Sequence, residues 1–130
     1  MKILVVDDEI DQLESLRRGL KSRGHSVAVA RDAELAVQML GEPDAAIDLM
    51  ITDYAMPGLD GSGLVERIRK THVELPIIMM SAYGRNELVI EAVGHGCNGF
   101  IEKPFTLDGI VREIEKATAR PPGGEEKDGR

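Results

Sequence analysis

Acidic side chains follow two apolar stretches of the sequence at the points where strands are expected to end. The run 2–6 leads directly into Asp7 and Asp8, and the run 47–53 ends on Asp53, shortly before a Pro-Gly turn. Ligands bind at the carboxyl edge of open α/β sheets, so these carboxylates lie where chemistry is expected. Divalent cations such as Mg²⁺ take oxygen ligands and offset the repulsion between neighbouring acids. The alternative is that the acids cap helices or turns and are otherwise solvated.

A hydroxyl and an ammonium group follow two further apolar runs. Ser81 comes directly after the run 75–80, and Lys103 comes just past the short run 99–101. With the acids, they could hold a cation and a phosphoryl group at once, and Asp53 could act as a nucleophile that forms an aspartyl-phosphate. Taken singly, Ser81 is also an ordinary polar strand end and Lys103 an ordinary surface lysine. The carboxylates after the first run argue against a flavin or dinucleotide site, because a phosphate-cradling loop would have glycines there.

Strand and helix patterns alternate five times along the chain. The apolar runs predict strands at 2–6, 26–30, 47–53, 75–80 and 99–101. Apolar residues at helical spacing predict helices over 10–20, 35–40, 64–70, 88–93 and 107–117. Asp32, Asn86 and Thr106 are the expected amino caps of three of them. This alternation predicts a single doubly wound α/β domain, (βα)5, with a parallel sheet and helices on both faces.

Composition limits the class of protein. The 130 residues suffice for one domain, and 23 acidic against 16 basic side chains give a net charge of −7. This balance argues against a nucleic-acid-binding or anionic-membrane surface in this segment. The single cysteine, Cys97, excludes an internal disulfide, and no stretch is long and apolar enough to span a membrane. We therefore expect a cytoplasmic domain over 1–119, followed by a disordered tail or linker over 120–130.

Four motifs together resemble the receiver domain of response regulators from bacterial two-component systems. They are Val6-Asp7-Asp8-Glu9, the stretch from Asp53 to Gly61 (DYAMPGLDG), Ser81-Ala82-Tyr83 and Lys103-Pro104-Phe105. The resemblance covers about residues 1–119. It implies a flavodoxin-like fold with strand order 2-1-3-4-5. It also implies that Asp53 accepts a phosphoryl group from a phosphohistidine on a sensor histidine kinase or a histidine phosphotransfer protein. Self-phosphorylation and slow autodephosphorylation are then the only enzymatic steps expected.

The same resemblance implies a metal site. Asp8 and Asp53 would ligate Mg²⁺ directly, together with the Ala55 backbone carbonyl and waters, and Asp7 would contribute through water. Mn²⁺ can substitute for Mg²⁺ in such a site. Ser81 and Lys103 would contact the phosphoryl oxygens, and the Lys103–Pro104 peptide bond is expected to be cis.

A conformational switch and a set of tuning residues are also implied. Phosphorylation would draw Ser81 toward the phosphoryl group, and Phe100 would turn inward. This movement would remodel the face made by the fourth helix, fifth strand and last helix, which would control an output domain or a target protein. Phosphorylation-dependent homodimers are one further expectation. Ala55 brings no polar group to orient water and Tyr83 is bulky, so both are expected to slow loss of the phosphoryl group.

Two other functions fit parts of the pattern. A degenerate receiver could serve as a constitutive protein-docking module, but this chain retains Asp53, Ser81 and Lys103. A metal-dependent phosphohydrolase with an aspartyl intermediate would carry a second acid two residues after its nucleophile. Ala55 stands at that position here, so the pattern disfavours this enzyme.

Overall fold

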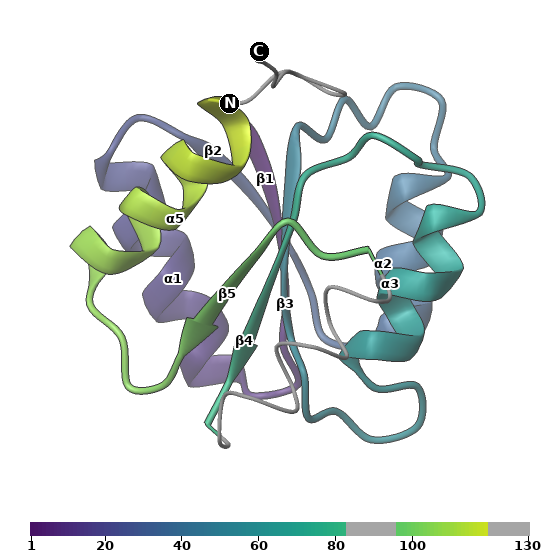
Figure 1. Ribbon diagram of the computed structural model, residues 1–130, viewed down its shortest axis with the longest axis horizontal. Coiled ribbons are helices and arrows are strands. Elements are labelled where there is room, and N and C mark those ends of the chain that lie inside the picture. Colours follow the sequence, from purple (N-terminus) through teal and green to yellow (C-terminus); the bar gives the residue numbers. More distant parts are fainter. Residues whose placement is uncertain (83–95, 120–130) are drawn as a thin grey trace, which may run out of the picture.

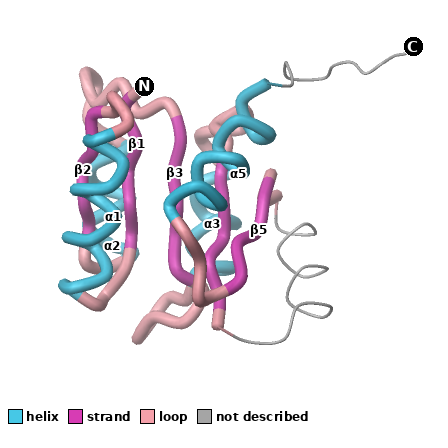
Figure 2. The backbone as a smooth tube through the Cα atoms, turned by 90° about the vertical axis from the view of Figure 1, so that its left-hand side faces the viewer, coloured by secondary structure: helices cyan, strands magenta, loops and turns pink. Residues whose placement is uncertain are grey.

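A single parallel sheet runs through the domain, and its strands end at the residues singled out above. The computed structural model describes residues 1–82 and 96–119. Within them the strands are β1 (Lys2–Val6), β2 (Ser26–Ala30), β3 (Leu49–Asp53), β4 (Ile77–Ser81) and β5 (Gly99–Glu102). They form a five-stranded parallel sheet in the order β2-β1-β3-β4-β5, and Figure 2 shows β2 and β5 at its two edges. The expected strand order is confirmed.

Two of the strands begin later than the sequence predicts. We expected the third strand from residue 47 and the fourth from residue 75, but they begin at Leu49 and Ile77. Pro76 has no N–H to donate, so only its carbonyl takes part in the pairing of the two strands. That carbonyl accepts a hydrogen bond from the Met50 N–H at 3.0 Å. At the start of β3, the Lys2 N–H goes to the side chain of Asp48 (2.7 Å). The fifth strand extends one residue past the expected range, to Glu102.

Four helices lie among the described residues, each close to its expected place. They are α1 (Ile10–Ser22), α2 (Ala33–Leu40), α3 (Gly61–Arg69) and α5 (Leu107–Ala119). The side chain of Asp32 caps α2 by accepting from the Leu35 N–H at 2.8 Å, as predicted, and Thr106 accepts from the Gly109 N–H at 2.9 Å. The expected helix over 88–93, its Asn86 cap and the expected tail over 120–130 lie outside the residues that the structure describes.

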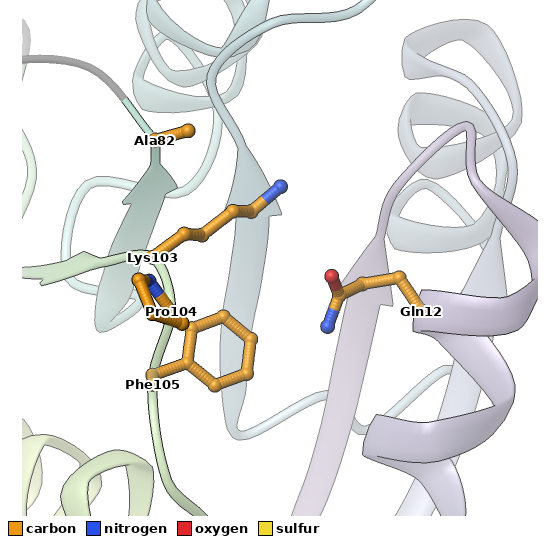
Figure 3. A pocket seen from close by; sticks show the side chains of 5 residues that line it. All are labelled: Gln12, Ala82, Lys103, Pro104 and Phe105. Carbon is orange, nitrogen blue, oxygen red and sulfur yellow. The ribbon is translucent and has the colours of Figure 1, made fainter.

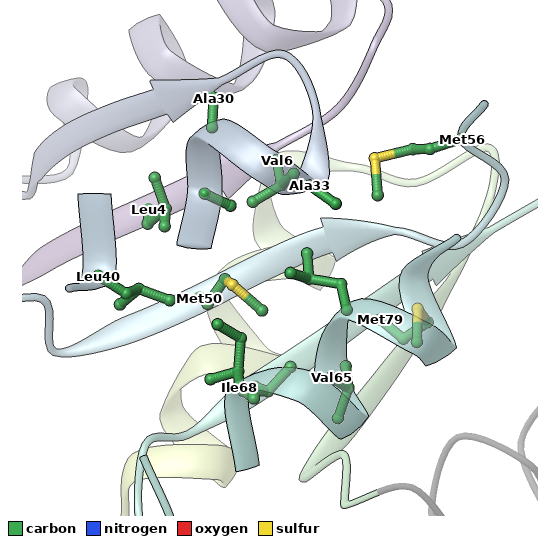
Figure 4. Packing of buried hydrophobic residues seen from close by; sticks show 13 residues of the cluster. Leu4, Val6, Ala30, Ala33, Leu40, Met50, Met56, Val65, Ile68 and Met79 are labelled. Atoms are coloured by element: carbon green, nitrogen blue, oxygen red, sulfur yellow. The ribbon is translucent and has the colours of Figure 1, made fainter. Parts of the chain in front are cut away.

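The helices cover both faces of the sheet. Figure 1 shows α1 and α5 on one side and α2 and α3 on the other. Successive side chains of a strand point to opposite faces, so Leu4 and Val6 pack with α2 and α3, whereas Ile3 and Val5 pack with α1 and α5. Figure 4 shows the first of these two clusters. Burial on both faces explains why the strands are continuous apolar runs rather than alternating ones.

Candidate functional site

Three of the predicted site residues meet at the carboxyl edge of the sheet. Asp7 directly follows β1, Asp53 ends β3 and Lys103 directly follows β5. The Lys103 Nζ lies 3.1 Å from the Asp53 Oδ1, and only 8% of the Asp53 side chain and 22% of the Lys103 side chain are exposed. The Asp53 carboxyl is therefore mostly buried and lies beside a cation. A carboxyl group in this position can react with an electrophile.

Asp7 is held in surroundings that disfavour its charged form. It is fully buried, and its Oδ1 accepts one hydrogen bond from the Glu9 N–H at 3.0 Å. Its Oδ2 is buried and has no hydrogen-bond partner among the residues that the structure describes. Burial raises the pKa of Asp7 to about 6; the Glu9 N–H opposes this rise, and the negative charge of Asp53 adds to it. A buried acceptor oxygen of this kind needs a cation or a proton to be satisfied.

The three acids form a set that fits a divalent cation. Oxygen atoms of Asp7, Asp8 and Asp53 all lie within 4.8 Å of one another, and this is the cluster of possible metal-binding side chains found in the described part of the chain. Asp8 is exposed, whereas the other two are buried. All the possible ligand atoms are carboxylate oxygens, which suit Mg²⁺. A bound cation would also give the buried Asp7 Oδ2 the partner that it lacks among the described residues. Which acid ligates directly stays a prediction of the family resemblance.

The loop after Asp53 folds back tightly onto the acceptor strand. The Tyr54 N–H donates to the Met80 carbonyl and the Gly61 N–H donates to the Tyr54 carbonyl, both at 2.8 Å. A Cβ at Gly61 would lie 2.5 Å from the Asp53 carbonyl oxygen, so only glycine allows this approach. Asp60 then starts α3 by accepting from the Gly63 N–H at 2.8 Å. Ala55 is exposed in this loop, and the role of its carbonyl stays a prediction.

Ser81 and Lys103 are brought together by the pairing of β4 and β5. The Lys103 N–H donates to the Ser81 carbonyl at 2.7 Å, and Ser81 is paired with Glu102 in the ladder. Ser81 is buried, with 1% of its surface exposed. The Lys103–Pro104 bond is cis, as the family resemblance implied. The roles of both side chains toward a phosphoryl group remain predictions.

The proposed switch and tuning residues are placed only in part. Phe100, in β5, is half-buried and packs against the cluster beneath α2 and α3. Its movement on phosphorylation stays a prediction. Tyr83 lies outside the described residues. Cys97 packs against the same cluster as Phe100, and burial raises the pKa of its thiol to about 12, which agrees with a packing role.

One residue beside the site, Gln12, is not predicted by any pattern in the sequence. A hollow of about 510 Å³ beside the site is lined by Gln12, Ala82, Lys103, Pro104 and Phe105. Figure 3 shows Gln12 reaching from α1 toward the Phe105 ring. Gln12 falls between the apolar positions of α1 and carries no motif of its own, so no signal in the sequence pointed to it.

Comparison with known proteins establishes the family of the chain. The family model described as the response regulator receiver domain matches residues 3–115. The chain therefore belongs to the receiver domains of two-component response regulators. Receiver domains of this family switch on phosphorylation, bind Mg²⁺ at an acidic pocket, and interact with histidine kinases and output domains.

Individual relatives agree with this assignment. The chain is 35% identical over 123 residues to the chemotaxis protein CheY-3 of Vibrio cholerae, covering 92% of this chain and 93% of that protein. It is 34% identical over 105 residues to the two-component response regulator ARR14 of Arabidopsis thaliana, covering 81% of this chain. The crystal structure of the receiver domain of NtrX from Brucella abortus is 38% identical, with a TM-score of 0.83, and the match covers 90% of this chain and 98% of that one.

The relatives differ greatly in length. The chain spans 93% of CheY-3 but only 28% of ARR14. The whole-protein activity of longer relatives therefore does not transfer directly. Within residues 1–82 and 96–119, no helix is long and apolar enough to cross a membrane.

Proposed function

We propose that this domain is a phosphorylation-activated switch in which Asp53 accepts a phosphoryl group from the phosphohistidine of a sensor histidine kinase or a histidine phosphotransfer protein. The observation that carries the proposal is the pairing of a buried Asp53 with Lys103 at 3.1 Å, within a cluster of three acids. We assign the receiver domain to residues 1–119 and place the reaction in the cytoplasm. With one cysteine the sequence holds no internal disulfide, which fits a reducing compartment such as the cytoplasm.

The transfer step needs a nucleophile and positive charge. An Asp53 carboxylate oxygen attacks phosphorus, the P–N bond to the donor breaks, and the electron pair stays on the imidazole nitrogen. Lys103 neutralises charge on the phosphoryl oxygens, and Ser81 donates a hydrogen bond to one of them. Asp7, Asp8, Asp53 and the Ala55 carbonyl would hold the cation. When bound, Mg²⁺ or Mn²⁺ supplies further positive charge to those oxygens.

The output face of the switch is made by β5, α5 and the helix expected over 88–93, which lies outside the described residues. Ser81 moves toward the bound phosphoryl group, and Phe100 turns inward from its half-buried position. The phosphoryl group shifts the population of the two states only as far as it binds one more tightly than the other. The altered surface controls an output domain or target protein, or a homodimer. Comparing the size of the protein with and without a phosphoryl mimic tests the homodimer.

Loss of the phosphoryl group is slow because water reaches it poorly. Ala55 offers no side-chain group to orient an attacking water, and Tyr83 adds bulk near Ser81 in the sequence. We expect Tyr83→Ala to speed dephosphorylation several-fold, measured as decay of the phosphorylated mass after the donor is removed. An unchanged decay rate would remove the shielding role.

Intact mass spectrometry tests the proposed function. The protein is incubated with Mg²⁺ and phosphoramidate, beside Asp53→Asn and a chelated control. A gain of one phosphoryl group that is lost in both controls is the expected result. No gain by the folded wild-type protein would contradict the proposal and favour a docking module.

A further inference from the structure

Asn98 directly precedes β5 and is followed in the sequence by Gly99. In an Asn-Gly pair the glycine nitrogen can reach the asparagine Cγ with little steric hindrance, because glycine has no side chain. The product of that attack is a five-membered succinimide, which water opens. We propose that Asn98 is a site of deamidation, with water as the co-reactant, and that Arg69 holds this site closed in the folded protein. This inference goes beyond the proposed function and does not depend on it.

Two donors from different parts of the chain hold the carboxamide of Asn98. Its Oδ1 accepts a hydrogen bond from the Ile77 N–H at 2.8 Å and another from the Arg69 Nη2 at 2.9 Å. Arg69 is itself fixed, because its guanidinium also donates to the Gly96 carbonyl at 2.8 and 3.1 Å and to the His72 carbonyl at 2.7 Å. The Asn98 side chain therefore cannot turn without breaking a hydrogen bond to a charged donor.

The direction in which the carboxamide is held keeps Cγ away from the attacking nitrogen. The Asn98 N–H donates to the Ile77 carbonyl at 2.7 Å, whereas the Asn98 Oδ1 reaches the Ile77 N–H. The N–H of a strand residue lies nearer the amino end of the strand than its carbonyl does, and β4 and β5 are parallel. The carboxamide is therefore turned back toward the amino end of β5. The Gly99 nitrogen lies on the opposite, carboxyl side of the Asn98 Cα, so the two reacting groups are kept apart.

The Gly99 nitrogen is not used to pair the two strands. Successive N–H groups of a strand point to opposite sides, and the Asn98 N–H points at β4, so the Gly99 N–H points away from β4. Among the described strands, β5 lies at an edge of the sheet, and Asn98 is exposed to water. Releasing the carboxamide from Arg69 and Ile77 therefore opens the way to the reaction.

The reaction balances with water alone. The Gly99 nitrogen bonds to the Asn98 Cγ, the Cγ–Nδ2 bond breaks, and the amide nitrogen leaves as ammonia with the proton from the Gly99 N–H. Water then opens the succinimide at either carbonyl, which gives aspartate or isoaspartate. Isoaspartate takes the backbone through the former side-chain carbon, so the paired hydrogen bonds with Ile77 at the start of β5 cannot be kept as they are.

Two variants separate the role of Arg69 from a general loss of stability. Arg69→Ala removes the charged donor from Asn98. Val27→Ala, in β2 at the other edge of the sheet, removes two buried methyl groups and leaves the Arg69 contacts in place. Urea unfolding measures the stability of both. Asn86, the other asparagine of the sequence, precedes Glu87 and serves as the internal reference for an asparagine without a following glycine.

Folded wild type, both folded variants and wild type unfolded in urea are incubated at neutral pH. Aspartate and isoaspartate at position 98 are then quantified by peptide mass mapping. Unfolded wild type should lose Asn98 much faster than Asn86, and folded wild type should lose Asn98 at least about tenfold more slowly than unfolded wild type. Arg69→Ala should lose Asn98 about tenfold faster than folded wild type, because a hydrogen bond from a charged donor is gone, and Val27→Ala should stay within about twofold of wild type. Equal rates in Arg69→Ala and wild type, or an equal rise in both variants, would overturn the inference. So would a folded wild type that loses Asn98 as fast as the unfolded chain, or an unfolded chain that keeps it.

Discussion

The carboxyl ends and the amino ends of the strands differ in how their polar groups are paired. At the carboxyl edge, two buried acids lie close together, and the buried Oδ2 of Asp7 has no hydrogen-bond partner within residues 1–82 and 96–119. At the amino edge, the side chain of Arg69 joins the end of α3 to the segment that precedes β5. It donates to the carbonyls of Gly96 (2.8 and 3.1 Å) and His72 (2.7 Å) and to the Asn98 Oδ1 (2.9 Å).

The amino edge is closed by partners from its own chain. The Asn98 Oδ1 also accepts from the Ile77 N–H at 2.8 Å, and the Asn98 N–H donates to the Ile77 carbonyl at 2.7 Å. Gly96 has a φ of +106°, and a Cβ there would lie 3.0 Å from the Arg69 side chain, so glycine is required. The hydrogen bonds at the amino edge therefore serve stability, whereas the acids at the carboxyl edge are left for a ligand to bind.

The largest expected effect is at the carboxyl edge. Lys103→Ala removes the cation 3.1 Å from the acceptor and should lower the phosphorylation rate about 100-fold, because a positioned charge on the transferred group is lost. The rate is measured by intact mass with phosphoramidate and Mg²⁺, on protein shown to be folded by circular dichroism. Lys116→Ala, which removes an exposed lysine of α5, is the control and should leave the rate unchanged.

Arg69→Ala should act on stability instead. It deprives two carbonyls and the Asn98 side chain of a donor, so we expect a loss of about 2 kcal/mol in the free energy of unfolding, measured with urea. Where the variant is folded, its phosphorylation rate should stay within about twofold of wild type. A large fall in that rate with stability unchanged would contradict the division of roles between the two edges.

Asp7→Asn tests how the buried carboxyl of Asp7 affects stability. The folded-state pKa of about 6 lies above the ordinary 3.8, so the folded state binds more protons and wild-type stability falls as pH rises from about 4 to 6. In the presence of chelator, Asp7→Asn should be more stable than wild type by on the order of 1–2 kcal/mol at pH 8. This difference should shrink toward pH 4. Adding Mg²⁺ should stabilise wild type more than the variant. A stability difference between Asp7→Asn and wild type that does not depend on pH would contradict a raised pKa of Asp7.

The smallest expected effect concerns a second buried oxygen. The Ser62 hydroxyl, in α3, is buried and has no hydrogen-bond partner in the described part of the chain. Ser62→Ala should raise the free energy of unfolding by about 0.5–1 kcal/mol, because it removes the unpaired group and alanine favours helix. Urea unfolding beside Ser15→Ala, at an exposed position of α1, checks this. Destabilisation by Ser62→Ala would indicate that the Ser62 hydroxyl makes a hydrogen bond in solution.

The sequence was sufficient for the sheet because local signals agreed with the tertiary fold. The strand over Ser26–Ala30 was predicted to the residue, and the cap at Asp32 was confirmed. The delayed start of β4 was also readable in principle, because Pro76 cannot donate to the ladder. The three acids and Lys103 could be placed together because parallel strands end at one edge.

What could not be predicted depends on contacts between distant segments. Arg69 and Gly96 are far apart in the sequence, and nothing in either residue type predicts the hydrogen bond between them. Nothing in the sequence distinguished Asp7, which is fully buried, from the exposed Asp8. The orientation of Gln12 toward Phe105 likewise follows from how α1 packs on the sheet.

Asp53, and neither Asp7 nor Asp8, is the proposed phosphoryl acceptor. Phosphorylated protein is reduced with borohydride, which converts an aspartyl-phosphate to homoserine, and the peptides are sequenced by tandem mass spectrometry. We predict homoserine at position 53 alone, and none when Mg²⁺ is chelated. Homoserine at position 7 or 8, or a phosphoryl gain with position 53 unmodified, would contradict Asp53 as the acceptor.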